Sequence, residues 1–274
     1  MWLFLGMVLA NPIPIYSFPY PCLDPRFPAL YRGWIIGCNA KGMIDKIYHI
    51  ESMRVQELSI ESEFVGVDTN AETLMQGHHG VWNITQEKSN SFPRINQEWT
   101  APATGKDGVW AYTTSHGVSI LTGRQRQDIA ANPRGWYPPA WWGGSIVWVE
   151  DDGRGGEDLW IYTLQDGAKI FRGGQLSQRH PIAVGDRLAW IEGDQIGLWS
   201  KAKEEPSFFD ADVVDRLAIG HKRLCWSERG TDIDIHCDDG FSLSRPGHQL
   251  WPSLWEEYLI FREGTQLMLY RFED

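Results

Sequence analysis

Residues 180–200 read HPIAVGDRLAWIEGDQIGLWS and predict three short strands joined by polar turns. Gly185 and Asp186 separate the first two apolar segments, and this pair of residues is typical of a tight hairpin turn. The third segment, IGLWS at 196–200, follows a second polar turn. Fifteen Trp, 28 Gly and 15 Pro in the whole chain also favour short strands and turns over helices.

The apolar strand with an aromatic residue recurs along the chain, as in IVWVE at 146–150 and LCWSE at 224–228. A third strand follows most copies, and a weaker fourth often comes next, as in AKIFRG at 168–173. Four short strands in a period of about 38 residues are typical of a propeller blade. We therefore predict an all-β fold, a β-propeller of about seven four-stranded antiparallel blades, with six blades as the alternative. The recurring aromatic residues are Trp34, Trp82, Trp110, Trp148, Trp190, Trp226 and Phe261.

The repeat is uneven near the start of the chain, where Trp82 comes late after Trp34 and early before the next copy. We expect the second blade to be out of register, with EFVGVD at 63–68 as an early strand. The last repeat ends after its third strand, QLMLYRF at 266–272. Because an unpaired sheet edge is open to aggregation, we expect IPIYSF at 13–18 to supply the missing outer strand.

The repeat combines a Pro-containing strand, a Gly-Asp turn, an apolar-Trp strand ending in Glu, and a strand with alternating aromatic and aliphatic residues. It resembles the TolB-like (WD40-like) propeller repeat, most closely at 180–200 and in PPAWWGGSIVWVEDDGRGGEDLWIYTL at 138–164. The resemblance is clearest over residues 99–274 and weaker over residues 20–60. It implies a periplasmic or secreted protein whose propeller binds other proteins and has no catalytic residues. The N-terminal α/β domain of TolB has no counterpart, because the first repeat begins near Asp24.

The N-terminal residues 1–10 contain the apolar run WLFLGMVL at 2–9, followed by Ala10. Small residues at the end of such a run resemble a secretory cleavage site, but the basic start of a signal peptide is missing. We interpret residues 1–10 as a truncated signal peptide or an apolar first strand, and residues 11–274 as one propeller domain.

The four Cys form two close pairs, Cys22 with Cys38 and Cys225 with Cys237, which suits disulfides in an oxidising compartment. The alternative is four buried thiols. Cys225 and Cys237 lie symmetrically about Thr231 in a predicted hairpin. Directly opposed strand residues are close enough for a disulfide, so this pair is the stronger candidate.

Several classes of function lack support in the sequence. A net charge of −11 argues against a nucleic-acid partner, which would need a dense Lys and Arg surface. Nucleophile-elbow, phosphate-loop and Cys-x-x-Cys motifs are missing, so we predict neither catalytic residues nor a cofactor. The Asp-rich stretch 151–158 and the scattered His lack metal-ligand spacing, so we predict no metal site. Beyond residue 10, the chain contains no apolar run long enough for a transmembrane segment.

The strand before each hairpin turn should be the innermost strand of its blade, and its side chains are the natural binding candidates. Aromatic and Arg residues dominate the binding energy at protein interfaces, so we predict a protein partner. Trp141 and Trp142 complete an aromatic cluster at 136–142 that favours the alternative of carbohydrate binding or glycoside hydrolysis. Strand alternation should place these two Trp on opposite faces, with at most one of them in the core. The candidate partner-binding residues are Arg26, Trp136, Tyr137, Arg179, His180 and Trp251.

Overall fold

The structure is a computed structural model that describes most of the backbone between residues 11 and 273. Outside the description lie residues 1–10, 18–28, 32–33, 38–43, 53, 63–64, 69–72, 77–79, 84–87, 91–103, 107–108, 115–116, 123–124, 131–136 and 274. Side chains are described mainly from residue 137 onward. Candidate residues Cys22, Arg26, Cys38 and Trp136 lie outside the described residues.

The described backbone forms seven four-stranded units, which we number as blades 1 to 7. Blade 1 contains β2 (Ala29–Tyr31), β3 (Trp34–Gly37), β4 (Ile44–His49) and β5 (Arg54–Ser62). Blade 2 contains β6 (Val65–Asp68), β7 (Thr73–Gln76), β8 (Gly80–Asn83) and β9 (Lys88–Asn90). Blade 3 contains β10 (Thr104–Lys106), β11 (Val109–Thr114), β12 (Gly117–Thr122) and β13 (Gln125–Ala130).

The remaining blades carry the clearest copies of the repeat. Blade 4 contains β14 (Ala140–Trp142), β15 (Ser145–Asp151), β16 (Glu157–Thr163) and β17 (Gly167–Arg172). Blade 5 contains β18 (Gln178–Val184), β19 (Arg187–Glu192), β20 (Gln195–Ser200) and β21 (Ser207–Asp210). Blade 6 contains β22 (Val213–Ile219), β23 (Leu224–Arg229), β24 (Ile233–Cys237) and β25 (Ser242–Leu243). Blade 7 contains β26 (Gln249–Trp255), β27 (Tyr258–Glu263), β28 (Gln266–Arg271) and the N-terminal β1 (Ile13–Ser17).

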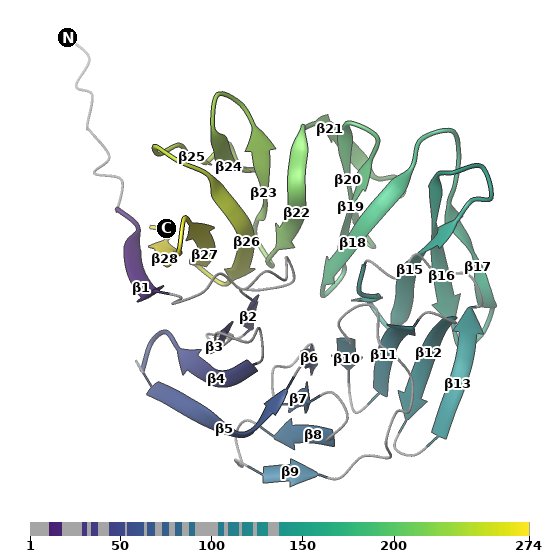
Figure 1. The fold of residues 1–274 in the computed structure, drawn as a ribbon. Coiled ribbons are helices and arrows are strands. Elements are labelled where there is room, and N and C mark those ends of the chain that lie inside the picture. Colours follow the sequence, from purple (N-terminus) through teal and green to yellow (C-terminus); the bar gives the residue numbers. More distant parts are fainter. Residues whose placement is uncertain are drawn as a thin grey trace.

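The blades follow one another around a ring (Figure 1), and the first strand of each unit is its innermost strand. Inner strands of neighbouring blades touch, from β10 through β14, β18, β22 and β26 to β2. The predicted all-β propeller fold is therefore confirmed, and the sheets contain seven four-stranded units rather than six.

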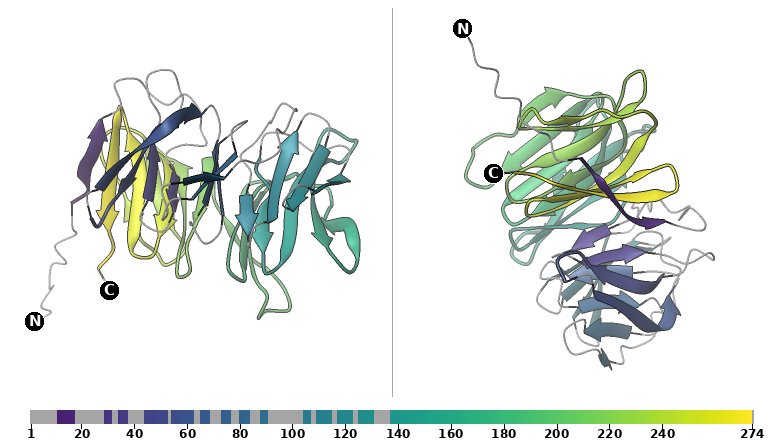
Figure 2. Two further views of the ribbon diagram at one scale, coloured as in Figure 1. Left: turned by 90° about the horizontal axis from the view of Figure 1, so that it is seen from below. Right: turned by 90° about the vertical axis from the view of Figure 1, so that its left-hand side faces the viewer.

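The N-terminal strand closes the last blade, as predicted. β1 pairs antiparallel with β28, placing Ile13 opposite Leu269 and Ser17 opposite Gln266. Figure 2 shows the two ends of the described chain on the same side of the molecule, with β1 alongside the C-terminal strands. This pairing covers the edge of β28 that would otherwise be exposed.

Blades 2 and 3 depart from the predicted pattern in two ways. Trp82 lies on β8, the third strand of blade 2, whereas the other recurring aromatics lie on second strands. The prediction that Trp82 lies on the same strand of its blade as the other recurring aromatics is therefore wrong, because GVWN resembles the second strands of the other blades. In addition, β6 and β10 pair in parallel and join the two blades into one eight-stranded sheet.

Three of the recurring Trp residues, Trp148, Trp190 and Trp226, pack between neighbouring blades. Trp148 and Trp190 are almost completely buried, and Trp190 shares a core cluster with Trp142 and Leu159 of the preceding blade. Burial of a Trp removes roughly 150–250 Å² from water and contributes about 4–6 kcal/mol before entropy losses are counted. The ring is therefore held together mainly by these contacts between blades.

Three Trp rings each donate a hydrogen bond to the Glu that lies two residues later in the chain. The indole Nε1–H of Trp190 donates to Glu192, and equivalent bonds join Trp148 to Glu150 and Trp226 to Glu228. The recurring Glu after the Trp is thus a structural position, as its periodicity indicates. Arg172 of blade 4 donates two hydrogen bonds to Glu192, which ties blade 4 to blade 5.

The hairpin of blade 6 contains a disulfide between Cys225 and Cys237. The two Cys are directly opposed in the β23–β24 register, as their symmetric placement in the sequence predicts. Both side chains are buried.

Candidate functional site

Two inner strands contain the same strained bulge. The pairing of β18 with β19 shifts between Arg179 and Ile182, and the pairing of β26 with β27 shifts at the equivalent place. His180 and Trp251 occupy these bulges with φ of 54° and 57°, and each is followed by Pro. A positive φ at a bulky residue costs of the order of 1–3 kcal/mol and is concentrated at functional sites.

His180 is held by the neighbouring blade on one side and by Tyr137 on the other. Its Nδ1 accepts the backbone N–H of Leu217 in β22 at 3.1 Å, so Nε2 carries the ring hydrogen. The Tyr137 ring lies edge-on to the imidazole, with centroids 5.6 Å apart. Burial, followed by the guanidiniums of Arg216 and Arg179, lowers the pKa of His180 to about 3. The imidazole is therefore neutral at physiological pH.

Trp251 is fixed by two arginines. The Arg262 guanidinium lies over the Trp251 ring, 4.5 Å from its centroid, and Arg216 donates to the Trp251 carbonyl at 3.0 Å. Arg216 therefore links the two bulges, because it also lies near enough to His180 to lower that residue's pKa. The sequence analysis did not select Arg216 or Arg262, because no local pattern indicates that they lie beside these bulges.

Arg179 differs from the other arginines whose side chains are described. It is exposed, and within the described part of the chain its guanidinium makes no hydrogen bond, ion pair or ring contact. Arg216 donates to the Trp251 carbonyl and Arg262 donates to the Gly264 carbonyl, and the remaining arginines form ion pairs with Asp or Glu. Those ion-paired residues are Arg126, Arg154, Arg172, Arg187, Arg223, Arg229, Arg245 and Arg271.

The structure thus brings together three of the predicted site residues, Tyr137, Arg179 and His180, which we call the donor group. Burial raises the pKa of Tyr137 and lowers that of His180, and Arg179 is close enough to oppose the first shift and add to the second. Trp251 lies two blades away along the inner strands and is connected to the group through Arg216. Each member of the donor group offers an N–H or O–H hydrogen, so the arrangement suits an acceptor or an anion.

The aromatic cluster at 136–142 is mostly part of the core. Trp142 is buried against Phe171 and Trp199, and its Nε1–H donates to the Asp186 carbonyl at 2.6 Å. Trp141 is half-buried and packs on the opposite face, against the core between blades 3 and 4. The prediction that Trp141 and Trp142 lie on opposite faces of their strand is confirmed. The expectation of at most one core Trp also holds, because Trp142 is a buried core residue and Trp141 is only partly buried.

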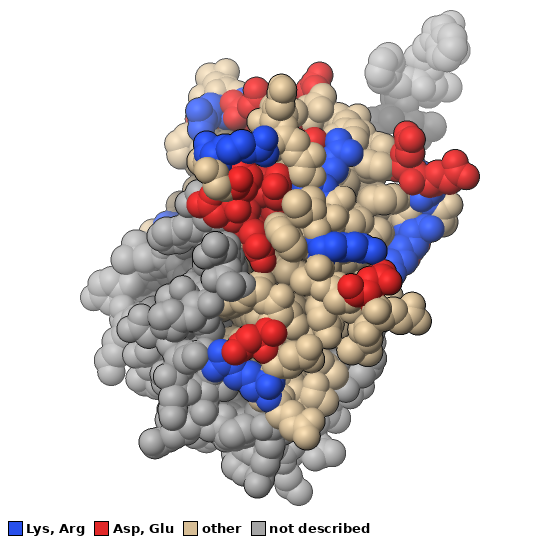
Figure 3. Space-filling model, turned by 90° about the vertical axis from the view of Figure 1, so that its right-hand side faces the viewer, with Lys and Arg blue, Asp and Glu red and all other residues tan. Residues whose placement is uncertain are grey.

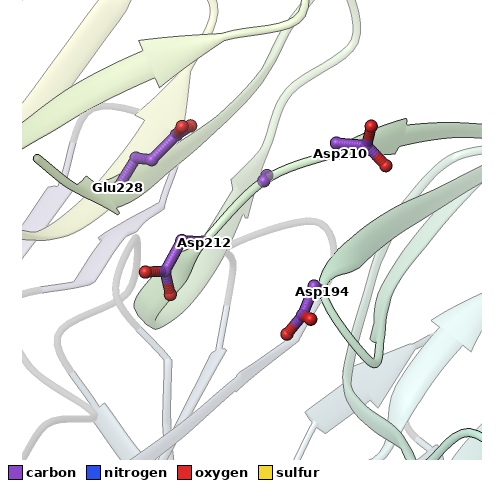
Figure 4. Close-up of a pocket in the computed structure, with 5 residues that line it drawn as sticks. Asp194, Asp210, Asp212 and Glu228 are labelled. Carbon is purple, nitrogen blue, oxygen red and sulfur yellow. The ribbon is translucent and has the colours of Figure 1, made fainter.

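A hollow of about 460 Å³ lies between blades 5 and 6. Figure 4 shows its carboxylates, with Asp210 and Asp212 on the connection from β21 to β22 and Asp194 and Glu228 on either side. Three of the four already interact with their own neighbours: Asp210 accepts from Gln195, Asp212 lies 3.9 Å from Arg229, and Glu228 accepts from Trp226. The sequence analysis selected none of these residues as a binding site.

Charged side chains on the outer surface lie close to charges of the opposite sign. Figure 3 shows Asp and Glu gathered beside Lys and Arg on the right-hand side of the molecule. The predicted Asp-rich turn at 151–158 follows the same rule, since Asp152 accepts the backbone N–H groups of Arg154 and Gly156. Among the described residues, no group of His, Cys, Asp or Glu is arranged to hold a metal ion. Within that part of the chain there is also no helix with the length and hydropathy of a membrane span.

Comparison with known proteins places the fold. No protein-family model and no curated protein matches the chain. BamB from Moraxella catarrhalis has a TM-score of 0.61 at 12% identity and covers 96% of this chain and 100% of its own. Virginiamycin B lyase from Staphylococcus aureus has a TM-score of 0.64 at 12% identity and covers 96% of this chain and 99% of its own. This chain has a β-propeller fold.

A third propeller shows how the ring closure differs. The β-propeller domain of the Trilobed protease from Pyrococcus furiosus has a TM-score of 0.65 at 9% identity, and 95% of each chain is covered. That domain is described as having an open velcro topology, whereas β1 of this chain pairs with the last blade. Such low identities establish the fold alone, and the neighbours include a lyase.

Proposed function

We propose that this chain is an exported, non-enzymatic β-propeller, with residues 11–274 as one domain, that binds a protein partner over the donor group. The observation that carries the proposal is Arg179, an exposed guanidinium without a partner among the described residues, beside Tyr137 and His180. Arg and Tyr are the residues most enriched at the energetic centres of protein interfaces. The strained bulge supports the proposal, because it fixes these side chains before any partner arrives.

Two further observations support the absence of catalysis and the export. A general base works best with a pKa near the operating pH, and His180, with a pKa of about 3, is poorly suited to that task. The Cys225–Cys237 disulfide supports an oxidising compartment, either the periplasm or outside the cell, in agreement with the TolB-like repeat. The carbohydrate alternative gains no support, because Trp141 and Trp142 pack against the core.

The proposal is tested by affinity capture from the envelope and secreted fractions of the source organism. Wild-type protein, Arg179→Glu and Arg229→Glu are compared after each variant is shown to melt at the wild-type temperature. Arg229 is an exposed arginine of blade 6 and controls for the change in charge. We expect a protein that is retained by wild type and by Arg229→Glu but not by Arg179→Glu. If Arg179→Glu retained the same protein as wild type, the donor group would be rejected as the binding site.

A further inference from the structure

Each member of the donor group has a hydrogen that it can donate. The guanidinium of Arg179 offers a planar set of N–H groups, and a neutral His180 offers Nε2–H because its Nδ1 already accepts from Leu217. The Tyr137 hydroxyl makes no hydrogen bond with any described residue. We infer that this group recognises a carboxylate, supplied by an Asp or Glu in an acidic segment of the protein partner; this inference rests on the proposed function.

The charge balance around the group favours an anionic segment. Burial and then the guanidiniums of Arg216 and Arg179 lower the pKa of His180, and burial and then the carboxylate of Glu157 raise the pKa of Tyr137; among the described residues no other carboxylate affects these two pKa values. Glu157 accepts a hydrogen bond from Ser177 at 3.1 Å, so it already has a partner within its own blade. The other exposed arginines of the described chain are neutralised by Asp or Glu, and Arg179 is not.

The geometry favours a carboxylate over a single carbonyl. Arg pairs with carboxylates through two parallel N–H···O bonds, and such charge-assisted bonds are about twice as strong as neutral ones. A carboxylate has lone pairs left for a third donor, which Nε2–H of His180 or the Tyr137 hydroxyl supplies. The His180 ring at the bulge packs edge-on to Tyr137, and Arg179 directly precedes His180 in the chain, so all three residues belong to this bulge.

The test is selection from a displayed library of random 12-residue peptides on the full chain, repeated on Arg179→Gln and Arg229→Gln. We expect the peptides selected on wild type and on Arg229→Gln to share an Asp or Glu at a fixed position. The same enrichment should disappear on Arg179→Gln. Peptides without acidic residues that still depend on Arg179 would overturn the carboxylate inference and leave the proposed function standing. An acidic enrichment that persists on Arg179→Gln, or no selected peptide at all, would also overturn it.

A double-mutant cycle then measures the pairing. The best peptide is synthesised with its fixed Asp or Glu and with the matching Asn or Gln, and both are titrated by fluorescence anisotropy. On wild type we expect the amide to bind about 10-fold more weakly or worse. On Arg179→Gln we expect the two peptides to differ by less than about 2-fold. Equal losses on both proteins would show that the carboxylate contacts some other group. Full displacement by inorganic phosphate at the concentration of the peptide would instead indicate a phosphate site and overturn the inference.

Discussion

Trp190 shows how one residue joins two blades in this protein. Its ring packs between blades 4 and 5, its Nε1–H donates to Glu192, and Glu192 in turn accepts two hydrogen bonds from Arg172. Glu192 is buried, so removing it leaves the buried Trp190 indole N–H without an acceptor, whereas the half-exposed Arg172 guanidinium still lies over the Phe208 ring. Opposite Trp190, Gly197 leaves room for the indole ring.

We expect Glu192→Ala to lower the free energy of unfolding by about 1–3 kcal/mol, since it leaves the buried Trp190 indole N–H unpaired. Glu192→Gln should lose less, because the amide oxygen still accepts the indole N–H. Urea denaturation followed by Trp fluorescence measures both changes. Glu257→Ala is the surface control, since this carboxylate pairs only with the exposed Arg271. Equal losses for Glu192→Ala and Glu257→Ala would show that the Trp–Glu–Arg contact does not hold the blades together.

The low pKa of His180 predicts how the free energy of unfolding changes with pH. Its pKa is about 3 in the folded chain and about 6.5 when unfolded, so below pH 6.5 only the unfolded chain binds the extra proton. Stability should therefore fall with decreasing pH, by about 2 kcal/mol between pH 7 and pH 5. His180→Asn is the matched variant, because Asn tolerates a positive φ and its side-chain oxygen can accept from Leu217. The difference between the two unfolding free energies should shrink steadily from pH 7 to pH 5, and a constant difference would be inconsistent with a buried neutral imidazole.

The hairpin β23–β24 is the element that the disulfide constrains. The bridge joins residues 12 positions apart, and closing a loop of about 15 residues is worth about 3 kcal/mol in the chain-entropy model. We expect Cys225→Ala with Cys237→Ala to lose about 2–3 kcal/mol of unfolding free energy. Wild type unfolded in the presence of a thiol reductant should lose a similar amount, whereas the double variant should not respond to the reductant. An identical stability of wild type and double variant would argue against an oxidised bridge in solution.

The strand β1 is the element that closes blade 7. Deleting residues 1–17 removes β1 and exposes the edge of β28, so we expect a loss of several kcal/mol and concentration-dependent aggregation. Deleting residues 1–10 stops short of β1 and is the matched control, with an expected change below about 0.5 kcal/mol. Thermal melts and light scattering report the two effects. If both deletions behaved alike, β1 would not be the closing strand.

For the molecule as a whole, periodicity predicts the fold better than it predicts the site. Local sequence patterns predict the blade repeat, the closure by residues 13–18 and the opposed positions of Cys225 and Cys237. Trp82 was misplaced because its local composition fits two different strands of a blade. The sequence does not predict the proximity of His180 and Arg216. This proximity arises where β18 of blade 5 contacts β22 of blade 6, and no local pattern encodes that contact.

The most direct test of the binding role is site-specific photo-crosslinking in the compartment where the protein functions. Tyr137 is replaced by p-benzoylphenylalanine, an aromatic residue of similar shape, and the same substitution at Tyr258 of blade 7 is the control. We predict a light-dependent crosslink from position 137 to one protein, its loss when Arg179→Glu is added, and no such product from position 258. A product from position 137 that survives Arg179→Glu, or the complete lack of one, would contradict the assignment of the donor group as the partner site.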